Sequence, residues 1–316
     1  MRRILLWTDT PGEYVAAVEA AGLAARVRME SLPRAQQPSE EQLAETEALL
    51  GWTVPPGLLP RMPKLRWAQA LMAGVEGWLA LPDLPPDLIL CCARGTHGDS
   101  MPENIIGALF HLTKPYAAAN EAQKEGRWQR RVPVSLNGKT LGILGLGAIG
   151  QELAMLAATL RMEVIGTRRH PTPLPGIAEV LPPERTDEVL SRADFVVLLL
   201  PATPETENFI DAARLSKMKP GAWLLNFGRG GAIVDADLIA AVTEKRIAGA
   251  LLDVFRTEPL PSEHPFWTTP GIQVIPHVGG MHAERDKAVA KLFVENLRRF
   301  LDGEELREVV DRNSGY

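Results

Sequence analysis

The chain has 316 residues, 46% of them hydrophobic and 23% charged, with a net charge of −5 and a pI near 5.8. This composition is typical of a globular protein with about two domains, and its acidic balance argues against nucleic acid as a partner. No apolar run approaches the roughly 18 residues of a membrane span, so no membrane partner is expected either.

The N-terminus and the cysteines indicate the compartment. Residues 1–10 contain only a brief apolar stretch, which predicts a first strand rather than a signal peptide. Cys91 and Cys92 are the only cysteines, and because they are adjacent they exclude a disulfide framework and fit a reducing cytoplasm. In an expected strand they point to opposite faces, where buried and unreactive thiols are predicted. The six histidines lack zinc-type spacing, so no metal is expected.

Short apolar runs alternate with helical patterns over residues 1–95. We expect strands at 3–7, 47–50, 65–70 and 87–92, and a helix over 15–25. Prolines are frequent between residues 33 and 86, so the connections there should be tight and irregular. The segment therefore predicts a small α/β domain.

A helix start follows at Ser100-Met-Pro-Glu103, a capping box with Ser100 at the cap. Pro102 suits the first turn, because the N–H that proline lacks would have no partner there. The helix should break before Pro115 and resume to about Gly126. A long helix between two α/β patterns is expected to serve as a hinge element.

Regular β–α alternation runs from residue 139 to residue 277. The expected strands are 140–144, 162–166, 194–200, 222–226, 248–254 and 272–276, and the expected helices are 149–160, 211–217 and 235–244. Strand–helix alternation with short links predicts a doubly wound parallel sheet. A last helix, about 283–301, has apolar residues at helical spacing and can return to pack on the first domain.

The segment Gly145-Leu-Gly147-Ala-Ile-Gly150 has the spacing of a dinucleotide-binding loop. It follows an expected strand and opens an expected helix, as that function requires. Gly145 permits the tight turn, Gly147 lets the backbone approach a pyrophosphate, and Gly150 lets helix and strand pack closely. The helix N-terminus adds N–H groups and a positive dipole. A plain strand–turn–helix is the alternative.

The tip of the next strand indicates which nicotinamide cofactor is bound. An NAD site places Asp or Glu about 20 residues after the loop to hold the ribose 2′-OH. This chain instead has Arg168 and Arg169 there and no acid. Arginine binds phosphate bidentately, so the pair predicts a 2′-phosphate site and NADPH. Two solvated surface arginines are the alternative.

Arg229, Glu258 and His277 each follow a short apolar run, at 222–226, 249–255 and 272–276. Parallel strands end at one edge, where open α/β sheets bind ligands. Glycines around Arg229 leave its guanidinium accessible to an anionic substrate. A carboxylate beside an imidazole favours a proton donor near neutral pH. A core histidine and a structural ion pair are the alternatives.

Asp253 stands inside the apolar run Leu-Leu-Asp253-Val-Phe. A buried carboxylate is costly unless it accepts hydrogen bonds. A nicotinamide carboxamide can supply the donors, and so can backbone N–H groups that the carboxylate caps. Both possibilities stay open at this point.

These segments resemble the D-isomer-specific 2-hydroxyacid dehydrogenase family over nearly the whole chain. The motifs that carry the resemblance lie at 144–150, 200–206, 226–230, 252–259 and 276–277. The run 258–267, the arginines after the second strand of the cofactor domain and the closing segment 310–316 are most like the A-type glyoxylate/hydroxypyruvate reductases.

The resemblance implies a fold and a reaction. A Rossmann-type dinucleotide-binding domain, 99–284, would be inserted in a discontinuous flavodoxin-like substrate domain, 1–98 and 285–316, each with a doubly wound parallel sheet. The reaction would be NADPH-dependent reduction of small 2-keto acids, glyoxylate and hydroxypyruvate first, with NAD also possible. Arg229 would bind the substrate, His277 would protonate the keto oxygen, and Glu258 would tune His277. Homodimers are expected.

The resemblance also implies further binding residues. The backbone N–H groups of Ala73, Gly74 and Val75 would hold the substrate carboxylate. Cofactor contacts are implied at Ala148, Ile149, Leu200, Pro201, Thr206, Phe227, Gly228, Asp253, His277 and Gly279. Met72 and Gly280-Met281-His282 depart from the family pattern, which leaves the identity of the substrate open.

Other functions use the same scaffold. A dinucleotide-sensing binding protein, such as a corepressor, would carry partner motifs or long tails, and neither is visible. A phosphoglycerate dehydrogenase often has a C-terminal regulatory domain, for which no residues remain. Formate and phosphite dehydrogenases usually select NAD, against the Arg168 and Arg169 signal. A reductase for a different 2-keto acid remains an alternative.

Overall fold

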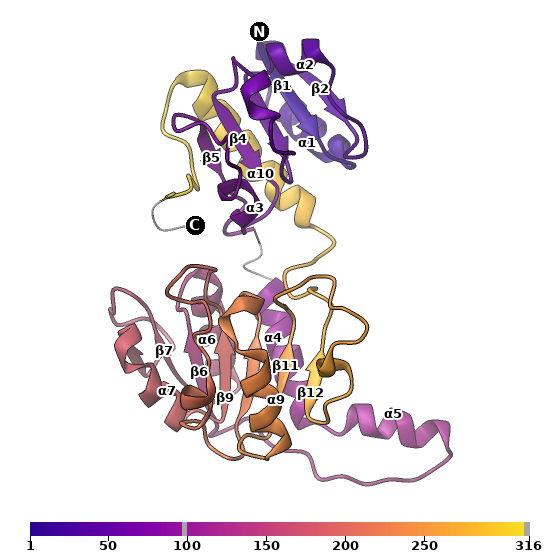
Figure 1. Cartoon of the computed structure of the whole chain (residues 1–316), viewed down its shortest axis with the longest axis vertical. Helices are drawn as coiled ribbons and strands as arrows, with labels where there is room; N and C mark the ends of the chain where they lie inside the picture. Colours follow the sequence, from indigo (N-terminus) through magenta and orange to yellow (C-terminus); the bar gives the residue numbers. More distant parts are fainter. Residues whose placement is uncertain (97–99, 313–316) are drawn as a thin grey trace. The chain divides into compact units, whose positions relative to one another are not determined.

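The computed structural model describes residues 1–96 and 100–312; the end of the closing segment, 313–316, lies outside these residues. The chain divides into two compact units. The terminal unit consists of Met1–Thr96 and His282–Tyr316, and the central unit is His97–Met281 (Figure 1). The first segment of this unit was predicted to end at residue 98 and ends at 96 in this division. Its second segment was predicted to begin at 285 and begins at 282.

The terminal unit contains a five-stranded parallel sheet in the order β2-β1-β3-β4-β5. The strands are β1 (Arg2–Trp7), β2 (Val27–Leu32), β3 (Ala48–Gly51), β4 (Trp67–Ala70) and β5 (Ile89–Cys91). All residues of β3 and β4 are buried, as expected for a sheet covered on both faces. The order is that of flavodoxin-like folds, so the predicted class of this unit is confirmed.

Helices α1 (Pro11–Ala20), α2 (Glu40–Glu45), α3 (Glu76–Leu79) and α10 (Arg285–Asp302) complete the terminal unit. The last helix, α10, packs against α1, as the sequence predicts. Its buried Phe293 stacks on Trp67 of β4 with 5.4 Å between ring centroids and meets Tyr14 of α1 edge-on at 6.1 Å. Aromatic pairs of this kind add to the burial energy, so α10 supplies a central part of this core.

One predicted helix of the terminal unit has the wrong bounds, and three elements of this unit were not predicted. The helix predicted at 15–25 begins at Pro11, where a missing N–H costs nothing, and ends near Gly22, whose φ of 70° is left-handed. Strand β2 was not predicted, because it lies at a sheet edge and its four interior positions are exposed or half-buried, three of them polar. The short helices α2 and α3 were not predicted either.

The central unit contains a seven-stranded parallel sheet in the order β12-β11-β10-β9-β6-β7-β8. The strands are β6 (Thr140–Leu144), β7 (Glu163–Thr167), β8 (Glu179–Leu181), β9 (Phe195–Leu198), β10 (Trp223–Asn226), β11 (Gly249–Leu252) and β12 (Ile272–Val274). The chain extends the sheet to one side through β8 and then returns to the other side of β6. The predicted Rossmann-type winding is confirmed, and its topological switch point lies between β6 and β9.

The helices of the central unit are α4 (Ser100–Thr113), α5 (Tyr116–Lys124), α6 (Ala148–Thr159), α7 (Thr186–Arg192), α8 (Ala212–Leu215) and α9 (Asp235–Thr243). The break predicted at Pro115 is confirmed, since α4 and α5 are separate helices. Strand β8 and helix α7 lie between residues 166 and 194, where no strand or helix was predicted from the sequence. In Figure 1, α5 and the chain after it extend away from the rest of this unit.

The predicted capping box at Ser100 is not the arrangement found. Helix α4 already includes Ser100 as its first residue. The Ser100 hydroxyl lies 3.2 Å from the Met281 carbonyl and accepts from Asn104 at 3.4 Å. Asn104 also donates to the Gly279 carbonyl at 2.8 Å. The polar residues at the start of α4 therefore hold the segment that follows β12.

The cores lie on both faces of each sheet. Cys91 and Cys92 are completely buried in different clusters of the terminal unit, so their predicted burial on opposite faces is confirmed. Among the described residues, no helix has the length and apolar character needed to cross a membrane.

Candidate active site

The strands of the central unit end in register. Leu144 of β6 pairs with Leu198 of β9, Leu198 with Asn226 of β10, Asn226 with Leu252 of β11, and Leu252 with Val274 of β12. The loops after these residues therefore leave the sheet at one edge. Every site residue predicted for this unit lies there, in a loop or a first helical turn: Gly145, Gly147, Ala148, Ile149, Gly150, Arg168, Arg169, Leu200, Pro201, Thr206, Phe227, Gly228, Arg229, Asp253, Glu258, His277 and Gly279.

The glycine loop has the geometry that a dinucleotide phosphate requires. Gly145 has φ of 108°, and a Cβ there would lie 2.8 Å from the Leu199 carbonyl oxygen. A Cβ on Gly150 would lie 2.6 Å from the Gly145 oxygen, so helix α6 approaches the strand closely. Beside Gly147, the N-cap of α6, a Cβ would meet no atom within 4 Å. The helix N-terminus therefore faces open space where a pyrophosphate fits.

Arg168 and Arg169 follow the last residue of β7. The backbone N–H of Arg168 donates to Leu181 of β8, and its guanidinium lies 3.4 Å from the Thr172 hydroxyl. Arg169 contributes to lowering the pKa of Glu205, after the hydrogen bond from Thr203, which is the largest cause. Both cations thus stand at the edge that carries the glycine loop, and the residues present fit a phosphorylated dinucleotide.

The loop after β9 is closed by its own hydroxyl group. Thr206 Oγ1 lies 2.6 Å from the Pro201 carbonyl and accepts the N–H of Thr203 at 2.9 Å. This hydroxyl therefore fixes the loop shape, a role that sequence reasoning did not assign. The cofactor contacts expected from Leu200, Pro201 and Thr206 stay predictions.

A buried asparagine shapes the loop that carries Arg229. The Asn226 side chain is completely buried, donates to the Arg229 carbonyl and accepts the Gly228 N–H, both at 3.0 Å. Gly230 lies so close to the next loop that a Cβ would be 1.9 Å from the Phe255 carbonyl carbon. Sequence reasoning missed Asn226, although a polar residue ending an apolar strand was a usable signal.

His277 and Glu258 meet directly. His277 Nδ1 lies 2.6 Å from Glu258 Oε2, while Glu258 Oε1 accepts the Phe255 N–H at 2.9 Å. His277 has a left-handed φ of 51°, and half of its side chain is exposed. An imidazole held through Nδ1 presents Nε2 to solvent, where it can give a proton to a ligand. The two residues predicted as an acid–base pair are brought together.

Asp253 accepts hydrogen bonds from backbone N–H groups, one of the two kinds of donor predicted for it. Its oxygens accept the N–H groups of Val278 at 2.8 Å and Gly279 at 2.9 Å. Burial raises the pKa of the Asp253 carboxyl, and these two N–H groups oppose that rise. Asp253 thus fixes the turn just after His277, and its contact with a cofactor stays a prediction.

Arg256 joins three loops of this edge and was not predicted from the sequence. It pairs with Glu207 at 2.5 Å and donates to the Gly231 carbonyl at 3.1 Å and to the Ile233 carbonyl. Its guanidinium also lies 3.7 Å from Asp235. The loops after β9, β10 and β11 are therefore held together beside Arg229 and Glu258.

The predicted carboxylate loop belongs to the terminal unit. Ala73, Gly74 and Val75 follow β4, with Val75 buried and the other two half-buried. Throughout the part of the chain that the structure describes, the N–H groups of these three residues form no hydrogen bond. These N–H groups can therefore donate hydrogen bonds to an anion, and their role in substrate binding stays a prediction.

Comparison with known proteins identifies the family. The model of the D-isomer specific 2-hydroxyacid dehydrogenase NAD binding domain matches residues 106–279. The chain belongs to this family. It is accordingly an NAD(P)-dependent 2-hydroxyacid dehydrogenase, with the two parallel-sheet α/β domains of such enzymes.

Individual relatives cover nearly the whole chain. Glyoxylate/hydroxypyruvate reductase A of Serratia proteamaculans is 30% identical over 302 residues, which are 94% of this chain and 95% of the relative. A family member of known structure from Aeromonas salmonicida is 34% identical with a TM-score of 0.89, covering 98% of this chain and 99% of its own. The NADPH-dependent glyoxylate/hydroxypyruvate reductase of Sinorhizobium meliloti, solved with NADP and sulfate, is 30% identical with a TM-score of 0.86 and full coverage of both chains.

Proposed function

We propose that the protein reduces small 2-keto acids, glyoxylate and hydroxypyruvate first, and that it prefers NADPH. The observation that carries the proposal is the Glu258–His277 contact at the sheet edge that also holds the glycine loop and Arg229. The names of the relatives from Serratia proteamaculans and Sinorhizobium meliloti support this substrate class. The NADP bound in the second of these supports the cofactor choice.

The bound nicotinamide would supply a hydride, and the residues of this chain would manage charge and the proton. As the keto carbon accepts hydride, negative charge grows on its oxygen. His277 would deliver a proton to that oxygen from Nε2, while Glu258 holds the ring through Nδ1. Arg229 would hold the substrate carboxylate and polarise the keto oxygen, because a guanidinium offers a planar fork of donors.

The remaining positions keep the roles predicted for them. Ala73, Gly74 and Val75 would bind the carboxylate through their N–H groups. The glycine loop and the start of α6 would hold the pyrophosphate, and Arg168 with Arg169 would hold the 2′-phosphate. The cofactor-contact residues after β9, β10, β11 and β12 complete the proposed site.

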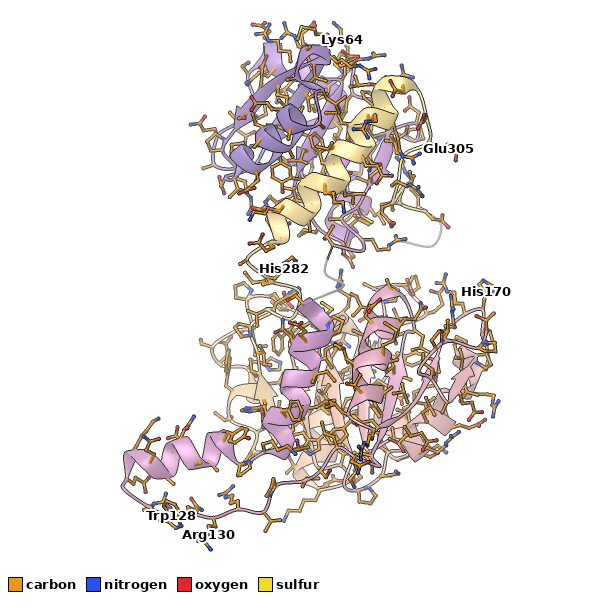
Figure 2. All side chains as sticks on the ribbon, turned by 180° about the vertical axis from the view of Figure 1, so that it is seen from behind. Lys64, Trp128, Arg130, His170, His282 and Glu305 are labelled. Carbon is orange, nitrogen blue, oxygen red and sulfur yellow. The ribbon has the colours of Figure 1, made fainter. Side chains whose placement is uncertain are left out.

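We also propose a homodimer, located in the cytoplasm. Helix α5 and residues 126–135 expose Tyr116, Trp128 and Val132, and 88% of Trp128 and 94% of Val132 is accessible. Figure 2 shows Trp128 and Arg130 on this projecting segment. Exposed apolar side chains gathered on one segment are typical of interaction surfaces. Sedimentation should give a dimer for the wild type and a weaker one for a Trp128→Ser, Val132→Ser double variant.

A substrate panel with both cofactors tests the proposed reaction. Glyoxylate and hydroxypyruvate should be reduced with NADPH, while their esters and simple aldehydes should hardly react. Arg229→Ala should lower kcat/KM severely, and Arg229→Lys should retain only part of it, because two charge-assisted bonds to the carboxylate are lost. Phenylpyruvate reduced faster than both small acids would overturn this choice of substrates.

A further inference from the structure

A cluster of two arginines and a tryptophan lies at the carboxyl edge of the terminal sheet and has no role in the proposed reaction. Trp52 directly follows β3. The guanidinium carbons of Arg34 and Arg285 lie 4.9 and 4.6 Å from its ring centroid. In the sheet order β2-β1-β3-β4-β5, the topological switch point falls between β1 and β3. Ligands of open α/β sheets bind at that point, so the cluster stands where this unit is expected to bind one.

Within residues 1–96 and 100–312, only one of the two arginines in the cluster forms an ion pair with a carboxylate. Arg285 pairs with Asp286 at 2.6 Å and donates to the Leu71 carbonyl. Its charge is therefore compensated. No carboxylate among the described residues forms an ion pair with Arg34, whose guanidinium has only the indole of Trp52 as its partner. Arg34 is thus the surplus cation of the cluster.

The turn that carries Arg34 is held rigidly. Trp7 Nε1 donates to the carbonyls of Pro33 at 3.2 Å and Gln36 at 3.0 Å, and the Gln36 N–H closes the turn on Pro33. The backbone N–H of Arg34 donates to Asp9 Oδ1 at 3.0 Å. An exposed cation on an anchored turn, stacked on an aromatic ring, is preorganised for a ligand, because little side-chain freedom remains to be lost on binding.

The cluster lies next to the proposed carboxylate loop of the same unit. Arg285 donates to the carbonyl of Leu71, and Leu71 immediately precedes residues 72–75. The N–H of Leu71 donates to the carbonyl of Gly51, the residue before Trp52. Neighbouring strands lie about 4.8 Å apart. Trp52 and Leu71, which directly follow β3 and β4, therefore lie about one strand spacing apart, and residues 73–75 come directly after Leu71 and Met72.

Resting on the proposed reduction of 2-keto acids, we propose that Arg34, stacked on Trp52, forms a second carboxylate subsite. It would bind the far carboxylate of four-carbon 2-keto dicarboxylic acids such as oxaloacetate, while the near carboxylate takes the 73–75 loop. A guanidinium fork on an aromatic platform matches a planar carboxylate. Arg34 is in this way a specificity-determining residue, and it takes no part in hydride or proton transfer.

Two acids that differ only in the far group test the subsite. Oxaloacetate and 2-ketobutyrate both have four carbons, but only the former has a second carboxylate. For each, kcat/KM is measured with NADPH in the wild type, Arg34→Gln, Arg34→Lys and the control Arg28→Gln. Arg28 lies on β2, the strand just before the turn that carries Arg34, and pairs with Glu30 at 3.2 Å. Its replacement therefore tests the effect of losing a nearby surface cation.

The ratio of the two kcat/KM values should fall about 10-fold or more in Arg34→Gln, as for loss of a hydrogen bond to a charged group. The ratio for Arg34→Lys should lie between those of Arg34→Gln and the wild type, and Arg28→Gln should keep the wild-type ratio. An unchanged ratio in Arg34→Gln, or an equal change in Arg28→Gln, would overturn the subsite while leaving the reduction of glyoxylate standing. If the wild type reduces none of glyoxylate, 2-ketobutyrate and oxaloacetate, the proposed function fails, and the subsite with it.

Discussion

Glu258 binds His277 through one carboxylate oxygen and the N–H of Phe255 through the other. The carboxylate is therefore fixed before it meets the imidazole, and its negative charge lies against the ring. We expect Glu258→Gln to change the shape of the pH–rate profile for keto-acid reduction, because glutamine supplies no charge at this position. Steady-state rates from pH 5 to 10 measure this. A profile that keeps its shape and only drops in height would show that Glu258 has a structural role alone.

The proton donor can be tested separately from cofactor binding. His277→Ala should lower kcat on the order of 10²–10⁴-fold, which is what a positioned proton transfer contributes. NADPH binding, followed by fluorescence titration, should change little. A variant that reduces glyoxylate at near the wild-type rate would contradict the proposed mechanism.

The two arginines after β7 determine our prediction for cofactor choice. Replacing Arg168 and Arg169 together with neutral residues should raise the KM for NADPH and leave that for NADH almost unchanged, since only NADPH carries the 2′-phosphate. Initial rates over a range of each cofactor give both constants. An equal loss for the two cofactors would mean that these arginines do not bind that phosphate.

Asp253 fixes the turn after His277, so its amide analogue should disturb both stability and activity. Asparagine can accept one of the two N–H groups from Val278 and Gly279, but its own NH₂ faces the other. We expect Asp253→Asn to lower the free energy of unfolding by about 1–3 kcal/mol, the cost of an unsatisfied buried donor, and to lower kcat as well. Urea unfolding measures the first effect. As a control, Asp302→Asn at an exposed position should leave the free energy of unfolding and kcat near those of the wild type.

The buried thiols predict a loss of stability in alkali. Burial raises the pKa of the Cys91 thiol from 9.0 to about 12, and burial raises that of Cys92 as well. Below pH 9 both the folded and unfolded chains keep the proton. For Cys91, the unfolded chain releases the proton first between pH 9 and pH 12, so stability falls with rising pH by at most ~1.4 kcal/mol per pH unit. Cys92 acts in the same direction.

Urea unfolding at pH 8 and pH 10.5 checks this sign. Cys91→Ala should be less stable than the wild type at pH 8 but should lose less stability between the two pH values. Iodoacetamide at pH 8 should label the wild-type thiols only as fast as the chain unfolds. Rapid labelling of the folded protein would show that the thiols are accessible.

The central unit was predicted well because its signals are local. Continuous apolar strands, a glycine loop between strand and helix, and polar residues directly after strands each specify their own neighbourhood. The edge position of Arg229, Glu258 and His277 follows from parallel winding alone, and the register of β10, β11 and β12 bears it out. The strand register does not show which of these side chains are in contact. The Glu258–His277 contact depends on the path of the loop after β11.

Features that depend on tertiary surroundings escaped prediction. Strand β2 is polar because it lies at a sheet edge, and its sequence alone looks like a loop. Asp253 and Arg256 hold backbone groups of other loops, which no spacing rule reveals. Arg34 is a further case, because its stacking on Trp52 joins residues from different loops that only the sheet order brings together.

The terminal unit is assembled from two stretches of chain with the whole central unit between them. On the ribosome, Tyr14 and Trp67 emerge long before Phe293, so the apolar face that α10 covers waits without its partner. The central unit is continuous and can finish folding in that interval, since domains generally fold as units during synthesis. Each newly made molecule therefore passes through a stage at which one unit is complete and the other is open. That stage, rather than the mature protein, is when the chain is most exposed to aggregation and to chaperone binding.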